Sequence, residues 1–169
     1  MKIIGSGLVL FSGVMLGFYK AFRYMEIQEN LQMMISVMEM FIGQIRMERA
    51  TLKEAVCRIS VRQSGEIGRV LQSTAGSIQK NDGKELYLIW QEEMETLSLA
   101  LPETIRKEWI HMLDQTGFYD REIQLKQLAD VNAHMKQEYE LMNKKKKETC
   151  RLYQSMGLLI SLFVIILLW

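Results

Sequence analysis

The chain has 169 residues, a formal net charge of +1 and 49% hydrophobic residues. This length suits one domain, and the near-neutral charge argues against nucleic acid as a partner, because nucleic-acid-binding proteins normally carry a basic excess on one face. One proline and thirteen methionines, with many Leu, Glu, Gln and Lys, favour helices. Cys57 and Cys150 lie far from each other and have no histidine at metal-ligand spacing, so neither a zinc site nor a disulfide framework is indicated.

An uncharged apolar run occupies residues 3–19, near the N-terminus. As a helix it would span roughly 25 Å, slightly less than a hydrocarbon core of roughly 30 Å. Ala21 and Phe22 can extend it while Lys20 reaches the lipid headgroups. A cleaved signal peptide is the alternative, but no small-x-small cleavage site follows the run. We therefore expect a retained transmembrane anchor at residues 1–23.

Gly13 and Gly17 form a GxxxG pair inside this run. Small residues at this spacing let two membrane helices approach closely, so the pair is a candidate for membrane helix packing. The alternative is that glycine is simply frequent in membrane helices.

The C-terminal run, residues 152–169, is also uncharged and ends in Trp169. Its strongly apolar residues make insertion into a bilayer favourable by roughly several kcal/mol. We expect a second transmembrane helix or tail anchor at residues 152–169.

Basic residues flank the two apolar runs on their inner sides, which predicts the orientation of the chain. Basic residues stay on the cytoplasmic side, so residues 24–151 are predicted to form a cytoplasmic domain. The same residues could contact anionic lipid headgroups, at about 1 kcal/mol each, although a solvated flank that only sets orientation explains them equally well. They are Lys20, Arg23, Lys144, Lys145, Lys146, Lys147 and Arg151.

The middle of the chain reads as a series of helices. Residues 24–49 carry apolar residues every three or four positions, which predicts a long amphipathic helix. Thr51 and Glu54 then form a capping-box pattern, so a second helix is expected from Leu52. The stripe of the first helix comprises Leu31, Met34, Ile35, Met38, Phe41, Ile42 and Ile45, and the second helix should bury Val56 and Ile59.

Four further helices are predicted after a polar loop at residues 62–68: one at about 66–79, one at about 84–99, one with Pro102 in its first turn and Gly117 as its C′ residue, and a long last helix capped by Asp120. The last helix has no breaker before Gly157, so it could run directly into the C-terminal span. The expected inward residues are Ile67, Val70, Leu71, Ile78, Leu86, Ile89, Trp90, Leu97, Ile105, Trp109, Met112 and Leu113, and then Ile123, Leu125, Leu128, Val131, Met135, Tyr139 and Met142. The fold class is therefore all-α: a cytoplasmic bundle of about six helices flanked by N- and C-terminal transmembrane helices.

Catalytic signals are missing from the sequence. It contains no P-loop motif, and glutamates on solvated helix faces have no reason for raised pKa values. His111 and His134 are the only histidines, and we expect structural roles for both. We predict no enzyme, no catalytic residue, no cofactor, no metal site and no small-molecule substrate.

Four fragments in order along the chain carry a family resemblance: residues 2–5 before the first span, residues 31–45 with Glu39 followed by 51–55, residues 113–117 with Asp120, Arg121 and Gln124, and residues 150–159 before the last span. Together they resemble the stage III sporulation protein AB family of endospore-forming bacteria. Two departures from the family's pattern occur: Leu52 replaces its usual proline, and Met156 its usual leucine.

The resemblance implies a non-enzymatic platform of the mother cell–forespore channel, a secretion-like complex needed for endospore formation. The family's cytoplasmic domain is similar to the platform domain of type II secretion and type IV pilus inner-membrane proteins. By that likeness the protein would lie in the mother-cell membrane around the forespore and contact a secretion-type ATPase of the same operon and other channel membrane components. Asp120 and Arg121 are interpreted as cap and ion-pair residues before partner contacts.

Two other functional classes remain open. One is a general membrane-tethered helical scaffold that binds another cytoplasmic assembly through its methionine-rich first helix. The other is a membrane-bound enzyme whose site has no linear signature.

Overall fold

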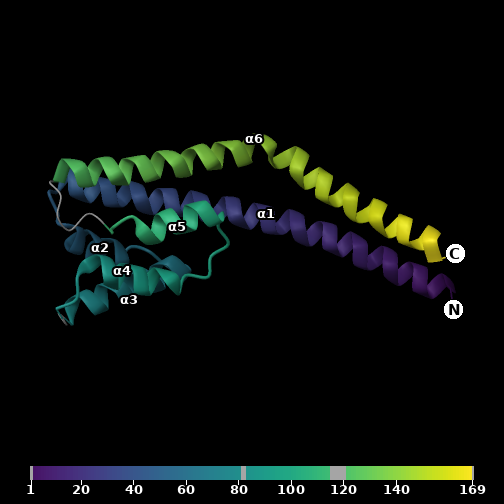
Figure 1. The fold of residues 1–169 in the computed structure, drawn as a ribbon, viewed down its shortest axis with the longest axis horizontal. Helices are drawn as coiled ribbons and strands as arrows, with labels where there is room; N and C mark the ends of the chain where they lie inside the picture. The colour runs from purple at the N-terminus through teal and green to yellow at the C-terminus, as the bar shows by residue number, and fades with distance from the viewer. Residues whose placement is uncertain (1, 81–82, 115–120, 169) are drawn as a thin grey trace. The chain divides into compact units, whose positions relative to one another are not determined.

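The computed structural model describes residues 2–80, 83–114 and 121–168, all of them in helices or their connections (Figure 1). These residues form six helices and no strand. The helices are α1 (Lys2–Met47), α2 (Leu52–Ser60), α3 (Gly65–Gln79), α4 (Leu86–Glu95), α5 (Glu103–His111) and α6 (Arg121–Leu168). The all-α prediction is confirmed, but the two terminal apolar runs are not separate helices, because each continues an end of α1 or α6.

Two compact units divide the chain. Unit 1 comprises Met1–Glu29 and Tyr139–Trp169, and unit 2 comprises Asn30–Glu138. The expected boundaries at residues 23 and 151 concern the membrane and stay predictions.

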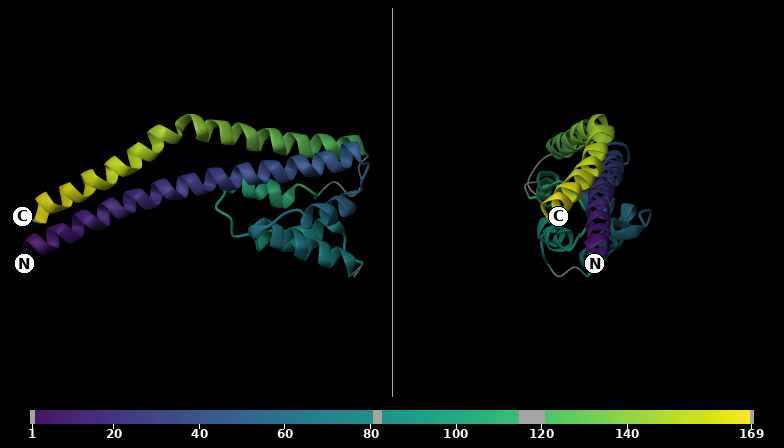
Figure 2. Two further views of the ribbon diagram at one scale, coloured as in Figure 1. Left: turned by 180° about the vertical axis from the view of Figure 1, so that it is seen from behind. Right: turned by 90° about the vertical axis from the view of Figure 1, so that its right-hand side faces the viewer.

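Unit 2 contains a core built against the predicted stripe of α1. Six of the seven stripe residues are buried, and Ile42 is half-buried. Helix α2 packs on α3, α3 on α4 and α4 on α5, beside the second half of α1 (Figures 1 and 2). Leu128 and Met135 of α6 are also fully buried. Each helix therefore supplies one apolar stripe to a common core, the arrangement expected of amphipathic helices.

Three aromatic rings lie at the centre of this core. Phe41 contacts Trp90 edge to face, with ring centroids 5.8 Å apart, and Trp90 lies at the same distance from Trp109. The indole N–H of Trp90 donates to the carbonyl of Trp109 at 3.0 Å, which satisfies its buried polar atom. Both tryptophans are thus core residues, as predicted.

Several predicted boundaries are wrong by a few residues. Helix α3 begins at Gly65, inside the expected loop. Helix α4 covers Leu86–Glu95 and stops before Leu99: the amides of Thr96 and Leu97 each donate three residues back, and the amide of Ser98 donates to the carboxylate of Glu66 at 2.6 Å. Pro102 occupies the N-cap position before α5 rather than its first turn.

The predicted inward residues are mostly buried, with one clear exception. Ile123 is 44% exposed at the start of α6, where the apolar pattern alone predicted burial. Helix propensity and the spacing of apolar residues identify the apolar face of a helix, but they do not tell whether another helix covers that face. Six other residues predicted to face inward are half-buried: Ile78, Leu86, Leu125, Val131, Tyr139 and Met142.

Unit 1 is a pair of antiparallel helical segments, the first part of α1 and the last part of α6. Figures 1 and 2 show them side by side, with both termini at the same end. Large apolar side chains on both segments are exposed, which is unusual for a surface in water. The most exposed are Phe11, Leu16, Tyr19, Phe22, Leu159, Phe163 and Ile166, each 64–67% exposed.

One helix among the described residues is long and apolar enough to cross a membrane, by length and composition alone. It is α6, and only 12% of its most apolar stretch is buried. The N-terminal span predicted at residues 3–19 stays a prediction, since the side chains of residues 2–10 are outside the described set.

Candidate functional site

The residues singled out from the sequence fall into two groups in the structure. Gly13, Gly17 and all seven flanking basic residues belong to unit 1, whereas Thr51, Glu54 and Arg121 belong to unit 2. Gly117 and Asp120 lie outside the described residues.

The glycine pair of α1 contacts α6. A Cβ atom on Gly13 would lie 2.7 Å from the Cβ of Ser161 and 2.9 Å from the carbonyl oxygen of Gly157. A Cβ on Gly157 would lie 2.5 Å from the carbonyl of Gly13 and 3.1 Å from the Cα of Gly17. No larger residue fits at these distances without moving a backbone. The GxxxG pattern therefore serves a close helix contact within the chain, and its partner Gly157 was not identified from the sequence.

Two polar contacts extend this helix pair beyond the apolar segments. The hydroxyl of Tyr24 donates to the carbonyl of Met142 at 2.9 Å, and the side-chain amide of Gln28 donates to Asn143 Oδ1 at 3.1 Å. These contacts join residues more than a hundred positions apart and fix the register of α1 against α6 within unit 1.

The flanking basic residues lie on the surface of unit 1. Arg23 pairs with Glu26 at 3.0 Å, one turn along α1. Lys20, Lys144, Lys145, Lys147 and Arg151 are exposed, and Lys146 is half-buried. No carboxylate of the described part of the chain lies within ion-pair distance of the basic residues of α6 between 144 and 151. Their charges are thus left for solvent, lipid or a partner.

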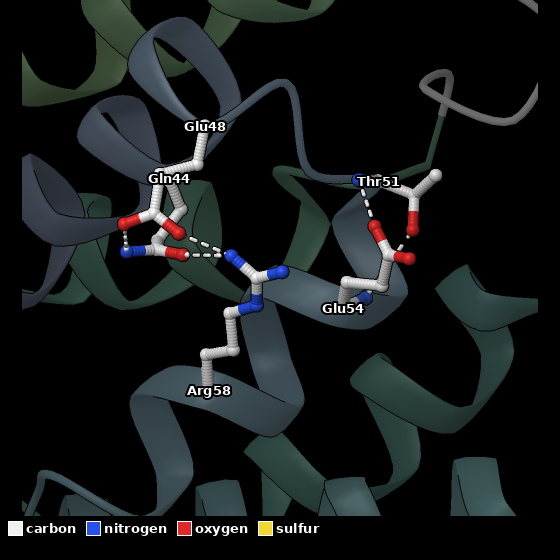
Figure 3. A network of polar contacts seen from close by, with 5 residues as sticks. All are labelled: Gln44, Glu48, Thr51, Glu54 and Arg58. Carbon is white, nitrogen blue, oxygen red and sulfur yellow. Dashed lines mark hydrogen bonds and ion pairs between the residues drawn. The ribbon is translucent and has the colours of Figure 1, made fainter.

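The capping box at the start of α2 forms, as Figure 3 shows. The amide of Glu54 donates to the Thr51 hydroxyl at 3.3 Å, and the amide of Thr51 donates to the Glu54 carboxylate at 2.8 Å. These hydrogen bonds hold the pKa of Glu54 below its usual range. Leu52 is the first residue of the helix and is buried, and the capping box forms with leucine at this position.

A second polar network joins α1 and α2 beside the cap (Figure 3). Arg58 donates to Gln44 Oε1 at 3.2 Å and also pairs with Glu48, and the amide of Gln44 donates to Glu48 at 2.8 Å. The network fixes the angle between the end of α1 and α2. All members of the network except Gln44 are exposed to solvent, and exposed ion pairs add little to the free energy of unfolding. The network therefore serves mainly to orient α2 against α1.

Helix α1 ends in a turn that normally uses glycine. Arg49 has φ of 54°, in the left-handed region, and the amide of the next residue, Ala50, donates back to the carbonyl of Gln44 at 3.2 Å. Arg121 of α6 completes this end, because its guanidinium donates to the carbonyls of Ile45 at 3.0 Å and Arg46 at 2.7 Å. Arg121 is therefore a cap for the C-terminal end of α1, a role that the sequence did not indicate.

Two structural contacts were missed from the sequence. A ring nitrogen of His134 lies 2.8 Å from the carboxylate of Glu108 in α5, and the other lies 3.9 Å from Glu138, one turn further along α6. Glu66 accepts from the amide and the hydroxyl of Ser98, and the hydroxyl's bond is the larger cause of its lowered pKa. The His134–Glu108 and Glu66–Ser98 contacts join segments far apart in sequence, which local patterns do not reveal.

No group of three or more His, Cys, Asp or Glu residues in the described part of the chain could hold a metal ion. Cys57 and Cys150 are half-buried free thiols in different units. The arrangement supports contacts with partners or lipid.

Taken together, these contacts define an all-helical protein with a compact helical unit and a pair of apolar helical segments, one of which can cross a membrane by length and composition. The chain belongs to the stage III sporulation protein AB family, whose model matches residues 2–169. The match covers the whole length and confirms the resemblance in the four sequence fragments. The family is not known as enzymatic, and no curated protein and no solved structure matches the chain.

Proposed function

We propose that the protein is a non-enzymatic platform of the mother cell–forespore channel, anchored by both termini in the mother-cell membrane, with residues 24–151 in the cytoplasm. The family match over residues 2–169 is the observation that carries this proposal. In this role unit 2 contacts a secretion-type ATPase and other membrane components of the channel.

The apolar surface of unit 1 supports anchoring at both ends. Phe11 and Phe22 of α1 are as exposed as Leu159 and Phe163 of α6, although the two segments pack on each other. Such a surface is unfavourable in water and favourable in hydrocarbon, by about 25 cal/mol per Å² of apolar area. Both segments are therefore expected to lie in the bilayer as one hairpin-like pair.

Unit 2 offers exposed apolar side chains where a protein partner could bind. Met47, at the end of α1, and Val61, just after α2, are each 82% exposed. Large apolar residues on an otherwise polar surface are frequent anchors of protein contacts. This region also holds the capping box and the Arg58 network, which keep its backbone in a defined geometry.

The proposal is tested first by removing the gene in the source bacterium. The expected result is a block in sporulation after engulfment with normal vegetative growth, restored by the wild-type gene. Normal spores without the gene would refute the proposal. A defect confined to growing cells would instead favour a general membrane-tethered scaffold.

Photo-crosslinking tests the ATPase contact. A photoreactive amino acid at Met47 or Val61 should capture the ATPase in sporulating cells, whereas one at Phe11, on the apolar surface of unit 1, should not. Capture from Phe11 alone, or no capture from Met47 and Val61, would contradict this assignment of the surface.

A further inference from the structure

A pocket of about 520 Å³ lies on unit 1 between its two helical segments, outside the contacts described above. Met25 of α1 lines one side, and residues of α6 line the other. The α6 residues are Asn143, Lys146, Lys147, Cys150 and Arg151. Their spacing of three and four places them on one face of the helix, the face turned toward α1.

The lining of this pocket is cationic and rich in hydrogen-bond donors. Lys146, Lys147 and Arg151 bring three positive charges, and no carboxylate lines the pocket. Asn143 adds a donor, because its Oδ1 already accepts from Gln28 and its side-chain NH₂ group is left to serve a ligand. Donors without acceptors suit an anion with several oxygens, such as a phosphate.

The position of the pocket along α6 matches the depth of lipid headgroups. At about 1.5 Å per residue, Lys146 lies roughly 9 Å and Arg151 roughly 1.5 Å before Leu152, where the apolar run starts. The headgroup layer on each side of a bilayer is roughly 5–8 Å thick. The apolar side chain of Met25 and the thiol of Cys150 face the same space as the charges, as an amphipathic headgroup requires.

We propose that this pocket binds the phosphate of an anionic membrane lipid, with Lys146, Lys147 and Arg151 as its charge contacts and Asn143 as an added donor. The proposal rests on the membrane anchoring in the proposed function. It goes beyond that function by assigning a defined headgroup site, in place of a general attraction between the basic segment and the membrane.

The chain offers a matched control in the neighbouring lysines. Lys144 and Lys145 carry the same charge within the same helical turns, are exposed, and do not line the pocket. A diffuse electrostatic attraction would depend equally on both pairs of lysines. A built site depends on Lys146 and Lys147.

The experiment uses the full-length protein in nonionic detergent, with bound lipid counted by native mass spectrometry. Phosphatidylglycerol should bind in preference to phosphatidylcholine. The double variant Lys146→Gln/Lys147→Gln should weaken phosphatidylglycerol binding about 30-fold, at about fivefold per lysine. The control Lys144→Gln/Lys145→Gln should lose less than about fivefold in total. Arg151→Gln should weaken binding in the same direction as the pocket pair.

Three outcomes would overturn the proposal: equal losses in both lysine pairs, no preference for phosphatidylglycerol, or displacement of the lipid by inorganic phosphate at equal concentration. Circular dichroism of each variant checks that the helices are intact. Extraction of native membranes with alkaline carbonate separates the two proposals, since a protein released by carbonate would refute the anchoring itself. A protein retained in the membrane without lipid preference would refute only the pocket.

Discussion

Arg49 holds a backbone conformation that L-amino acids other than glycine rarely adopt. Its φ of 54° costs roughly 1–2 kcal/mol, and the turn persists because the amide of Ala50 donates back to Gln44 and Arg121 donates to two carbonyls in the last turn of α1. Arg121 thereby joins the start of α6 to the end of α1, two segments separated by 75 positions or more. A single guanidinium replaces hydrogen bonds that the helix cannot make for itself.

Replacing Arg49 with glycine should stabilise unit 2 by about 0.5–1 kcal/mol, because glycine adopts this φ without steric cost. The matched control is Arg46→Gly, an exposed residue in the last turn of α1, which should lose about 1 kcal/mol through helix propensity. Thermal unfolding followed by tryptophan fluorescence reports both changes through Trp90 and Trp109. A loss of stability in Arg49→Gly would mean that its side chain makes a contact worth more than the strain.

At the scale of helices, contacts distant in sequence decide where elements end. Helix α4 ends at Glu95, and shortly after it the amide of Ser98 donates to Glu66 of α3, which keeps the chain from continuing as a helix to Leu99. The capping box of α2, by contrast, is wholly local, and its sequence pattern located the helix start correctly.

The Glu66–Ser98 contact should make the stability of unit 2 depend on pH. The pKa of Glu66 is lowered from its ordinary value of 4.5, so the folded state binds the proton less readily than the unfolded chain. Hydrogen bonds to a charged, partly exposed group such as Glu66 contribute about 1–2 kcal/mol to the free energy of unfolding. This contribution is present above pH 4.5 and is lost as the pH falls through the lowered pKa of folded Glu66.

Thermal midpoints of wild-type and Glu66→Gln protein between neutral pH and about pH 3 test this dependence. The variant should be less stable at neutral pH, and the difference should shrink below pH 4.5. Glu103→Gln is the control, because Glu103 is exposed and 3.7 Å from Lys107, and such pairs contribute little at any pH. A gap between wild type and Glu66→Gln that stays constant with pH would contradict the assigned cause.

For the whole molecule, the distribution of basic residues predicts on which side of a membrane each segment lies. The basic residues follow the first apolar run and precede the second, so both termini are predicted to lie on the far side from unit 2. The two segments of unit 1 run antiparallel, with both termini at the same end (Figure 1), and their orientation relative to a membrane stays a prediction.

Thiol labelling of intact cells tests this orientation. A cysteine added at either terminus should react with a membrane-impermeant reagent, and Cys57, in unit 2, should react only after the cells are opened. Replacing Cys150 with serine removes the other natural thiol from the readout. Labelling of Cys57 in intact cells would reverse the predicted orientation.

Periodicity, local hydrogen-bonding patterns and residue order were enough to predict the all-helical class, the stripe of α1, the capping box of α2 and the family. Four features became visible only in the folded chain: the contact of Gly157 with Gly13, the cap that Arg121 makes for α1, the early end of α4 and the exposure of Ile123. Each of these depends on which distant segment lies opposite a residue, and a linear pattern specifies the face of a helix but not the neighbour that covers it.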